Sequence, residues 1–295
     1  MSDFRLKVFQ SVAKNLSFTK ASQELFVSQP AITKHIQELE ATYQTRLFDR
    51  QGSKISLTES GRLLLEHCER ILEDYKRLEY EMHLLHNEYI GELKLGASTT
   101  IAQFVLPPLL GSFIGKFPQV SLSLLNGNSR EIEAALQEHR IDLGLVEGVF
   151  RLPNLKYTTF LEDELVAVVH SKSRLQLPEE ITPQDLPAIP LVLRERGSGT
   201  LDVIERSLQK HGVKLSSLHV LMYLGSTESI KLFLENSDCM GIVSIRSICK
   251  ELAAGTFRVV EIKDMPMLRD FCFVQLQGQE GGLSQAFMNY MFMSR

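Results

Sequence analysis

The sequence predicts a multidomain α/β protein, in which a small helical region with a two-stranded hairpin precedes a long helix and a larger region of two α/β lobes. Three patterns predict this order. Apolar residues first recur at helical spacing, then follow a 3.5-residue period between residues 59 and 88, and from residue 91 onward strand patterns alternate with helix patterns. A length of 295 residues and a hydrophobic content of 44% suit several packed domains.

The first sixty residues contain three short helical patterns. Apolar residues between Phe4 and Ala13 share one helix face, and Ser17 is placed to cap a second helix. A tight turn at residues 26–27 follows, and Ser28 is placed to cap a third helix. This arrangement is typical of a helix-turn-helix, whose last helix enters the major groove of DNA.

The polar face of the third helix carries Gln29, Thr33, Lys34 and Gln37, whose side chains can hydrogen-bond base edges or phosphates. An ordinary solvated helix face is the alternative interpretation of these residues taken alone. The charge distribution adds context, because residues 1–58 carry eight basic and five acidic side chains, a net charge of +3, whereas residues 59–90 carry four basic and eight acidic ones, a net charge of −4. The overall charge of −4 therefore hides a basic N-terminal region.

A small strand is predicted from the alternation of residues 54–57, after a turn at residues 51–53. Together with residues 47–50 it has the shape of a wing. Arg50 and Lys54 lie where a wing would meet a phosphate backbone or a minor groove, with scattered surface charge as the alternative.

The N-terminal region resembles the LysR-type transcriptional regulators. The resemblance is carried by five motifs in the family's order: Phe18-Thr19-Lys20-Ala21-Ser22, Val27-Ser28-Gln29-Pro30-Ala31, Ile36-Gln37-Glu38-Leu39-Glu40, Arg46-Leu47-Phe48-Asp49-Arg50 and Leu57-Thr58-Glu59-Ser60-Gly61. It implies base or backbone contacts from Gln29, Pro30, Thr33 and Lys34, with Arg50 and Lys54 in the wing. With the helix cap and the remaining polar position included, the expected DNA-binding residues are Ser28, Gln29, Pro30, Thr33, Lys34, Gln37, Arg50 and Lys54.

The resemblance also implies the division of the chain. We expect a winged helix-turn-helix domain over residues 1–58, a linker and dimerisation helix over residues 59–88, and a two-lobed α/β effector-binding domain, similar to periplasmic binding proteins, over residues 91–295. Lobe I is expected to comprise about residues 91–162 and 266–295, and lobe II about residues 163–265.

The linker helix carries apolar residues at alternating steps of four and three, which is the seam of a coiled coil, although a one-sided core helix would produce a similar stripe. The residues expected to mediate dimerisation are Leu64, Ile71, Tyr75, Leu78, Met82 and Leu85. Two recognition helices held by a symmetric seam would read an inverted repeat in double-stranded DNA. The family resemblance further implies a tetramer that bends DNA.

In the C-terminal region, strand patterns are predicted at residues 93–97, 120–125, 142–146, 164–169, 189–194, 218–224 and 241–243, with helices between them. Four of the turns after these strands are rich in Ser, Thr and Gly: residues 98–100, 126–129, 197–200 and 225–227. Each would place hydroxyl and backbone N–H donors at a helix N-terminus, which favours an anion, although such residues also cap helices structurally.

The resemblance implies an effector site between the lobes, formed by Ser98, Thr99, Thr100, Ser129, Glu147, Ser198, Thr200 and Thr227. The expected effector is a small, anionic metabolite. An unpaired Glu147 carboxylate would repel an anion and suit an ammonium, so an amino acid derivative is the alternative. Effector binding is expected to change the angle between the lobes, and with it the DNA bend and the contact with RNA polymerase.

Other functional classes fit less well. An enzyme is disfavoured because catalytic motifs are missing from the sequence, and a transport receptor is disfavoured because it needs export and has no use for a winged domain. A DNA-binding protein without an effector is a further alternative. The start of the chain lacks a signal-peptide pattern, so we expect a cytoplasmic protein without a membrane span.

We expect no cofactor and no metal site, because the histidines and the four cysteines show no ligand spacing. Cys239 and Cys249 are close enough in sequence to suggest a redox switch, although Cys239 is expected to pack as a small buried hydrophobe.

Overall fold

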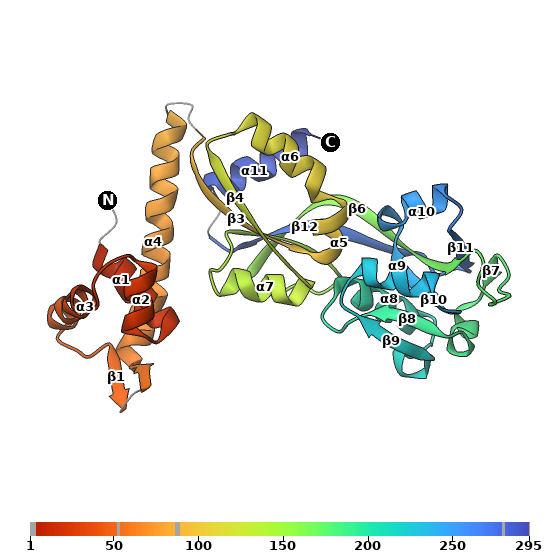
Figure 1. Ribbon diagram of the computed structural model, residues 1–295, viewed down its shortest axis with the longest axis horizontal. Coiled ribbons are helices and arrows are strands. Elements are labelled where there is room, and N and C mark those ends of the chain that lie inside the picture. The colour runs from red at the N-terminus through yellow and green to blue at the C-terminus, as the bar shows by residue number, and fades with distance from the viewer. Residues whose placement is uncertain (1–3, 52–53, 86–88, 279–280, 295) are drawn as a thin grey trace. The chain divides into compact units, whose positions relative to one another are not determined.

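The computed structural model describes residues 4–51, 54–85, 89–278 and 281–294, and the chain divides into two compact units, residues 1–88 and 89–295 (Figure 1). Each unit has its own buried apolar core, so each is described separately.

The N-terminal unit is a three-helix domain with a hairpin and a long final helix. Its elements are α1 (Phe4–Asn15), α2 (Phe18–Glu24), α3 (Gln29–Tyr43), β1 (Phe48–Gln51), β2 (Lys54–Leu57) and α4 (Glu59–Leu85). The Ser17 side chain accepts a hydrogen bond from the Lys20 N–H at 3.2 Å, and Ser28 accepts one from Ala31 at 3.4 Å. These caps start α2 and α3 at the predicted positions. Between the two helices Phe26 adopts a φ of 55°, which makes the turn tight.

The first half of α4 belongs to the core of this unit. Leu72 and Cys68 are buried in it with the apolar faces of α1, α2 and α3, and the Cys68 thiol donates to the Leu6 carbonyl at 3.3 Å. Gly61 lies so close to the β1 side of the domain that a Cβ atom there would stand 2.1 Å from the Leu47 carbonyl oxygen. Only glycine therefore permits this approach of α4 to the domain.

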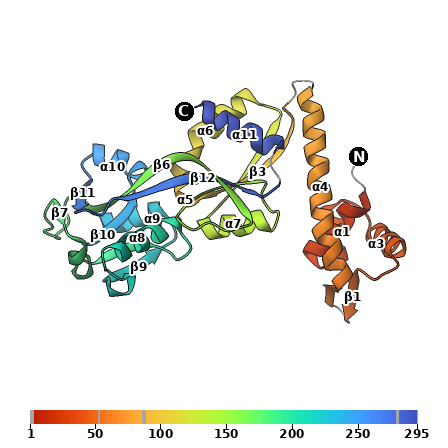
Figure 2. The ribbon, with the colours of Figure 1, turned by 180° about the vertical axis from the view of Figure 1, so that it is seen from behind.

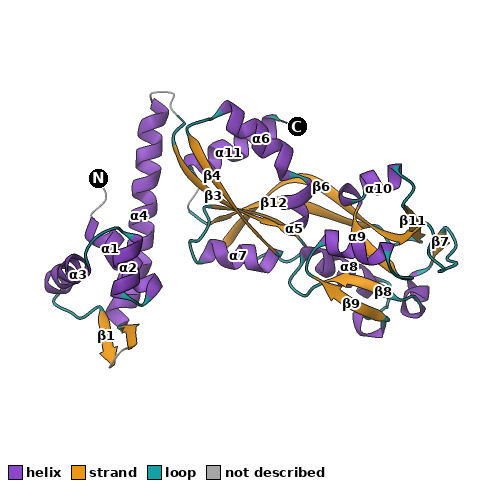
Figure 3. Cartoon of the chain, viewed as in Figure 1, coloured by secondary structure: helices purple, strands orange, loops and turns teal. Residues whose placement is uncertain are grey.

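The C-terminal unit is built on one mixed ten-stranded sheet. The strands along its main path are, in order, β4 (Val120–Gly127), β3 (Gly91–Ser98), β5 (Leu143–Glu147), β12 (Met267–Leu276), β6 (Leu155–His170), β10 (Met240–Ser244), β8 (Leu191–Arg194) and β9 (Val220–Leu224), while β11 (Phe257–Ile262) pairs with β6 and β7 (Glu180–Ile181) pairs with β11. The β4-β3-β5 and β10-β8-β9 groups are parallel. The long antiparallel pair β6 and β12 runs between them (Figure 3).

Two lobes result from this topology. Lobe I surrounds β3, β4 and β5 with the helices α5 (Thr99–Phe104), α6 (Leu106–Lys116), α7 (Ser129–Gln137) and α11 (Gly282–Met293). Both views place α6 and α11 on one face of this part of the sheet and α7 on the opposite face (Figures 1 and 2). Lobe II surrounds β8, β9 and β10 with α8 (Gly199–Lys210), α9 (Thr227–Glu235), α10 (Cys249–Ala253) and the short 3₁₀ helices η1 (Pro183–Ala188), η2 (Leu215–Ser217) and η3 (Ile245–Ser247).

The structure adds elements that the sequence patterns did not predict. Strand β6 begins at Leu155, whereas the sequence predicted a strand only from residue 164. The pattern missed the first half of β6 because buried and more exposed residues alternate imperfectly there. Strands β11 and β12 and helices α10 and α11 also lie beyond the last predicted strand. Among the described helices, none is both long and apolar enough to cross a membrane.

Candidate functional site

The outer face of α3 is polar and accessible. Gln29, Lys34 and Gln37 are exposed, and Thr33 is half-buried with its hydroxyl donating to the Gln29 carbonyl at 3.1 Å. Ile32, Ile36 and Leu39 occupy the buried face of the same helix. The apolar face therefore fixes the helix on the domain and leaves the polar face available to a partner.

The start of α3 is ordered by its neighbours. Ser28 and Pro30 are exposed at its first turn, where the missing N–H of proline costs no hydrogen bond. The Thr19 hydroxyl donates to the Gln29 side-chain oxygen at 3.3 Å, which links α2 to the first residue of α3. In the wing, β1 and β2 pair in antiparallel register with Arg50 opposite Ile55. The side chains of Arg50 and Lys54 lie outside the described part of the structure.

The second half of α4 carries an apolar stripe that the rest of the N-terminal unit leaves open. Ile71, Leu78 and Met82 are exposed and Tyr75 is half-buried, whereas Leu64 packs against the core of the domain. The side chain of Leu85 is not described. Exposed fractions of 52% for both Leu78 and Met82 are large for apolar residues on one face of a helix.

In the C-terminal unit, the predicted effector residues lie at the carboxyl ends of the parallel strands, where the two lobes meet. Ser98, Asn128, Ser198 and Ser226 are the N-cap residues of α5, α7, α8 and α9. All eight predicted side chains are buried: Ser98, Thr99, Thr100, Ser129, Glu147, Ser198, Thr200 and Thr227. Ligands of open α/β sheets bind at this edge.

The lobes approach each other closely at Gly199, the first residue of α8. A Cβ atom at this position would stand 2.0 Å from the Glu147 carbonyl oxygen at the end of β5. The Ser129 hydroxyl donates to the same carbonyl at 2.8 Å, and the Arg130 N–H donates to the Gly197 carbonyl at 3.3 Å. Backbone atoms of the two lobes are thus in direct contact in this arrangement.

Glu147 is paired rather than free. Its carboxylate accepts a short hydrogen bond from the Ser98 hydroxyl and lies 3.5 Å from Arg269 Nη1. Arg269 also pairs with Asp163 at 2.7 Å and donates to the Thr200 hydroxyl at 2.9 Å. Because the carboxylate is paired, the condition under which an ammonium would suit Glu147 is not met.

Sequence reasoning missed Arg194, the last residue of β8. Its guanidinium is buried and makes two hydrogen bonds to Glu195, from Nε at 2.8 Å and from Nη2 at 2.9 Å. The Nη2 group also reaches the Gly225 carbonyl at 3.2 Å and, across the lobe boundary, the Thr99 hydroxyl at 3.4 Å. A basic residue at the end of an apolar strand pattern was the signal that could have revealed it.

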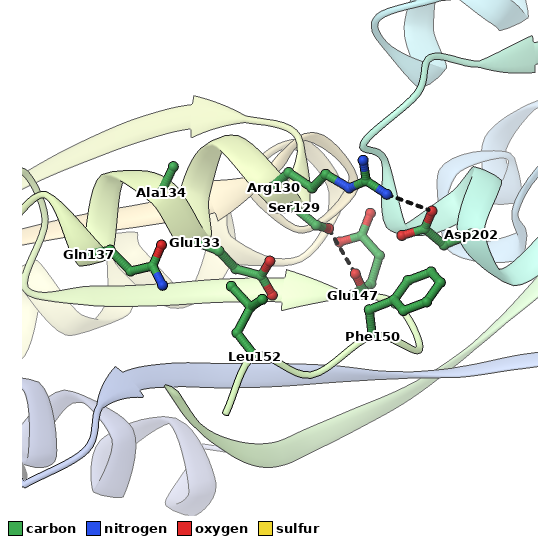
Figure 4. A pocket seen from close by; sticks show the side chains of 10 residues that line it. Ser129, Arg130, Glu133, Ala134, Gln137, Glu147, Phe150, Leu152 and Asp202 are labelled. Carbon is green, nitrogen blue, oxygen red and sulfur yellow. Dashed lines mark hydrogen bonds and ion pairs between the residues drawn. The ribbon is translucent and has the colours of Figure 1, made fainter. Parts of the chain in front are cut away.

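A pocket of about 380 Å³ lies beside Glu147, between α7, the loop after β5 and the start of α8 (Figure 4). Its lining combines polar and apolar side chains: Ser129, Arg130, Glu133, Ala134, Gln137, Glu147, Gly148, Phe150, Leu152 and Asp202. Two of the predicted effector residues therefore contribute to it. Arg130 of lobe I reaches toward Asp202 of lobe II, with 3.9 Å between the guanidinium and the carboxylate (Figure 4).

Two carboxyls in this pocket resist ionisation. Burial raises the pKa of Glu133, an effect that the hydrogen bond from the Tyr157 hydroxyl at 2.7 Å partly offsets. Burial also raises the pKa of Asp202, with Arg130 acting in the opposite direction. The pocket is consequently a poor environment for uncompensated negative charge.

The cysteines give no support to a redox switch. Cys239 is buried and Cys249 is exposed, and burial raises the pKa of the Cys239 thiol. Burial raises the pKa of Cys68 to about 12 and also raises that of Cys272, so these buried thiols are poor nucleophiles. Within the described residues, no group of His, Cys, Asp or Glu side chains is arranged to hold a metal ion.

Two family models match the chain. The bacterial regulatory helix-turn-helix protein model of the LysR family matches residues 4–62, and the LysR substrate binding domain model matches residues 86–292. The chain is 32% identical over 268 residues to a probable RuBisCO transcriptional regulator of Cyanidioschyzon merolae, covering 90% of this chain and 88% of the relative.

Two solved structures have similar folds. The regulatory domain of CcmR from Synechocystis PCC6803, in complex with 2-PG, has a TM-score of 0.62 and 28% identity, covering 69% of this chain and 97% of that chain. Full-length CbnR complexed with its target DNA has a TM-score of 0.63 and 23% identity, and the match covers 100% of both chains. The second likeness, at this identity, concerns the fold alone.

Proposed function

The chain belongs to the LysR-type transcriptional regulators, DNA-binding regulators with an effector-binding domain and not enzymes, and we propose that it reads an inverted-repeat DNA site with α3 under the control of a small anionic metabolite. The observation that carries the proposal is the contrast between the accessible polar face of α3 and the buried polar groups where the lobes meet. The protein acts in the cytoplasm, where its DNA is accessible.

The DNA-reading surface comprises the part of α3 from Gln29 to Gln37 and the wing. Gln29, Thr33, Lys34 and Gln37 contact base edges or phosphates in the major groove, because amide, hydroxyl and ammonium groups match the donors and acceptors there. Exposed Ser28 and Pro30 lie at the end of the helix that enters the groove. Arg50 and Lys54 contact the phosphate backbone or minor groove through the wing.

Self-association through α4 brings two such surfaces together. Burying the stripe of Ile71, Tyr75, Leu78 and Met82, continued by Leu85, against a second copy removes exposed apolar surface from water. A two-fold axis through this contact relates two α3 helices, which therefore require two half-sites of opposite orientation.

A second contact between copies would produce the tetramer. The strands at the two ends of the main path of the large sheet, β4 and β9, both expose apolar side chains: Leu124 and Leu125 on β4, and Leu221, Met222 and Tyr223 on β9. Uncovered apolar edges are avoided in monomers, which supports coverage of these edges by another copy. Leu124→Glu should reduce the tetramer to a dimer in light scattering, whereas Glu substitution at exposed Met293 should not.

The effector binds where the lobes meet, among Ser98, Thr99, Thr100, Ser129, Glu147, Ser198, Thr200 and Thr227. The complex of the CcmR domain with 2-PG, at 28% identity, makes 2-phosphoglycolate the first candidate to test. Because the contacts at Gly199 join backbone to backbone, a ligand that favours another lobe angle must break them. The resulting change alters the spacing of the paired winged domains and the contact with RNA polymerase.

The test is footprinting of DNA captured by the full chain from genomic fragments, with increasing 2-phosphoglycolate. We expect an inverted-repeat footprint whose extent changes saturably. A footprint without two-fold symmetry would refute the proposed mode of DNA reading. A symmetric footprint that neither 2-phosphoglycolate nor any of a panel of other small anions and amino acid derivatives alters would refute effector control and leave DNA reading intact.

A further inference from the structure

The turn between α2 and α3 presents an aromatic side chain almost entirely to solvent. Phe26 is 95% exposed, and no other large apolar side chain that the structure describes is more exposed. A phenylalanine ring in water forgoes the gain that burial of its apolar surface would give. Packing of the domain therefore does not account for a phenylalanine at this position.

The backbone conformation of Phe26 adds a second cost. Its φ of 55° lies in the left-handed region, where a bulky side chain is rare and glycine or asparagine is favoured. Neighbouring contacts hold the turn, because the Phe26 N–H donates to the Gln23 carbonyl at 3.4 Å and the Val27 N–H to the Ser22 carbonyl at 3.1 Å. A strained residue whose side chain the domain leaves exposed is a candidate for function.

Phe26 adjoins the surface that we propose to read DNA. The flanking residues, Leu25 and Val27, both pack against the core of the domain and so fix the turn between them. Ser28, the cap of α3, follows two residues after Phe26. Because two residues of chain span at most about 7 Å, the Phe26 Cα atom lies within that distance of the end of α3 that enters the major groove.

A comparison with Leu16 shows what distinguishes Phe26. Leu16 lies in the turn between α1 and α2, has a φ of 45° and is also apolar, but its exposed fraction is 47%. The whole of α2 separates Leu16 from α3 along the chain. The two turns share a backbone conformation, but only Phe26 combines nearly complete exposure with a place beside the start of α3.

An aromatic ring can recognise a feature of DNA that polar side chains do not complement. The amide, hydroxyl and ammonium groups of α3 match hydrogen-bonding groups on base edges and phosphates. The 5-methyl group of thymine is the apolar feature of the major groove, and phenylalanine is one of the side chains that contact it. A phenyl ring offers nothing comparable to a charged phosphate, so a base methyl group is the favoured partner.

Given DNA reading by α3 in the proposed function, on which this inference rests, we propose that Phe26 contacts the 5-methyl group of one thymine in each half-site. The contact removes two apolar groups from water and so offsets the exposure of the ring. Phe26 thereby becomes a specificity-determining residue, in addition to the polar residues of α3 and the wing.

The experiment uses the duplex that the full chain selects from a random library. Each thymine of the half-sites is replaced in turn by deoxyuridine, which lacks only the 5-methyl group, and fluorescence anisotropy measures the Kd of each duplex. Phe26→Ala removes the ring. Phe26→Asn also removes the ring and suits a left-handed turn. Leu16→Ala, at an exposed apolar residue with a similar φ, is the matched control.

For the wild-type chain and the control, deoxyuridine at one position of a half-site should weaken binding about fourfold, the effect of losing one buried methyl group. Both Phe26 variants should bind the thymine duplex about tenfold more weakly than the wild type, and deoxyuridine at that position should weaken their binding no further. Phe26→Asn should melt at or above the wild-type temperature, because it relieves the backbone and loses no packed side chain. Its weaker binding would then not result from unfolding.

Equal affinity of the wild-type chain for the thymine duplex and every deoxyuridine duplex would overturn the proposal. The same deoxyuridine effect in the wild-type chain and the Phe26 variants would overturn it too, since another residue would then contact the methyl group. If the Phe26 variants bound all duplexes more weakly but kept the wild-type deoxyuridine effect, the ring would act without reading the base. The reading of DNA by α3 is judged separately, by the two-fold symmetry of the selected duplex and by the consensus that Gln29→Ala selects.

Discussion

The outer face of α3 and the meeting of the two lobes both gather polar side chains, but they use them in opposite ways. On α3, Gln29, Lys34 and Gln37 are exposed, and the only side-chain hydrogen bond found for them among the described residues is the one that Gln29 accepts from Thr19. Between the lobes, Glu147 and Arg269 are buried and pair with other groups of the protein. Polar residues at a macromolecular interface can therefore change with little cost to folding, whereas those at a buried ligand site are part of the fold.

The largest expected effect tests the buried side of this comparison. Arg269→Met leaves Glu147 and Asp163 without their shared cation, and removing one partner from a buried ion pair costs about 3–5 kcal/mol of unfolding free energy. Urea denaturation of the full chain measures this loss as a change in the unfolding free energy of the C-terminal unit. Arg246→Met, at a partly exposed arginine 3.6 Å from the same Asp163, is the control and should cost far less. Equal losses would show that burial does not govern the network.

A smaller effect is expected from Gly199→Ala, which tests the close contact of the lobes. The added methyl group would overlap the Glu147 carbonyl, so the lobes must separate or the backbone must shift, at a cost of about 1–3 kcal/mol. The control is Gly111→Ala in α6, where a Cβ meets nothing within 4 Å and alanine should stabilise the helix by up to about 1 kcal/mol. If both variants melt at the wild-type temperature, the contact at Gly199 is not tight.

A pH-dependent effect is expected at Glu133. Because its pKa is raised in the folded protein, folding favours the protonated carboxyl, and this contribution is lost as the pH rises from the ordinary value through the raised one. Glu133→Gln cannot ionise and keeps an oxygen for the Tyr157 hydroxyl. It should therefore raise the melting temperature at neutral pH and lose this advantage in acid, below the ordinary pKa. A gain of the same size at both values of pH would contradict the assigned cause.

The smallest effect on stability is expected on α3. Lys34→Ala should leave the unfolding free energy within about 0.5 kcal/mol of the wild type, since the side chain is exposed. Loss of a phosphate contact should nevertheless weaken DNA binding about tenfold. It should also reduce the slope of the logarithm of the affinity against the logarithm of the salt concentration by about one. Fluorescence anisotropy at several salt concentrations measures both. Unchanged affinity would place the DNA-reading surface elsewhere.

Much of the local structure could be predicted from the sequence, because it depends on neighbouring residues. Ser17 and Ser28 cap their helices as predicted, and the turns after β3 and β4 open α5 and α7. The contacts that determine the ligand site join distant residues instead. Arg269 lies beside Glu147 because its strand, β12, returns from lobe II and pairs with β5. The sequence pattern did not predict β12.

The sequence pattern marks Arg194 as a basic residue at a strand end, but it does not show which groups pair with the guanidinium. Whether an arginine at a strand end is exposed, paired or left with free donors depends on Glu195, Thr99 and Gly225 around it. Glu195 and Gly225 lie in two different loops of lobe II, and Thr99 begins α5 in lobe I. The pairing of Glu147 is a further example, because nothing local distinguishes a free carboxylate from one that a distant arginine neutralises.

The central claim is that the exposed polar face of α3 reads an inverted repeat, and selection of bound sequences from a random duplex library by the full chain tests it most directly. The account predicts two half-sites of opposite orientation from the wild-type chain, and a changed consensus at one position of each half-site from Gln29→Ala. Recovery of a motif without two-fold symmetry, or of the same consensus from Gln29→Ala and Thr33→Ala, would contradict it.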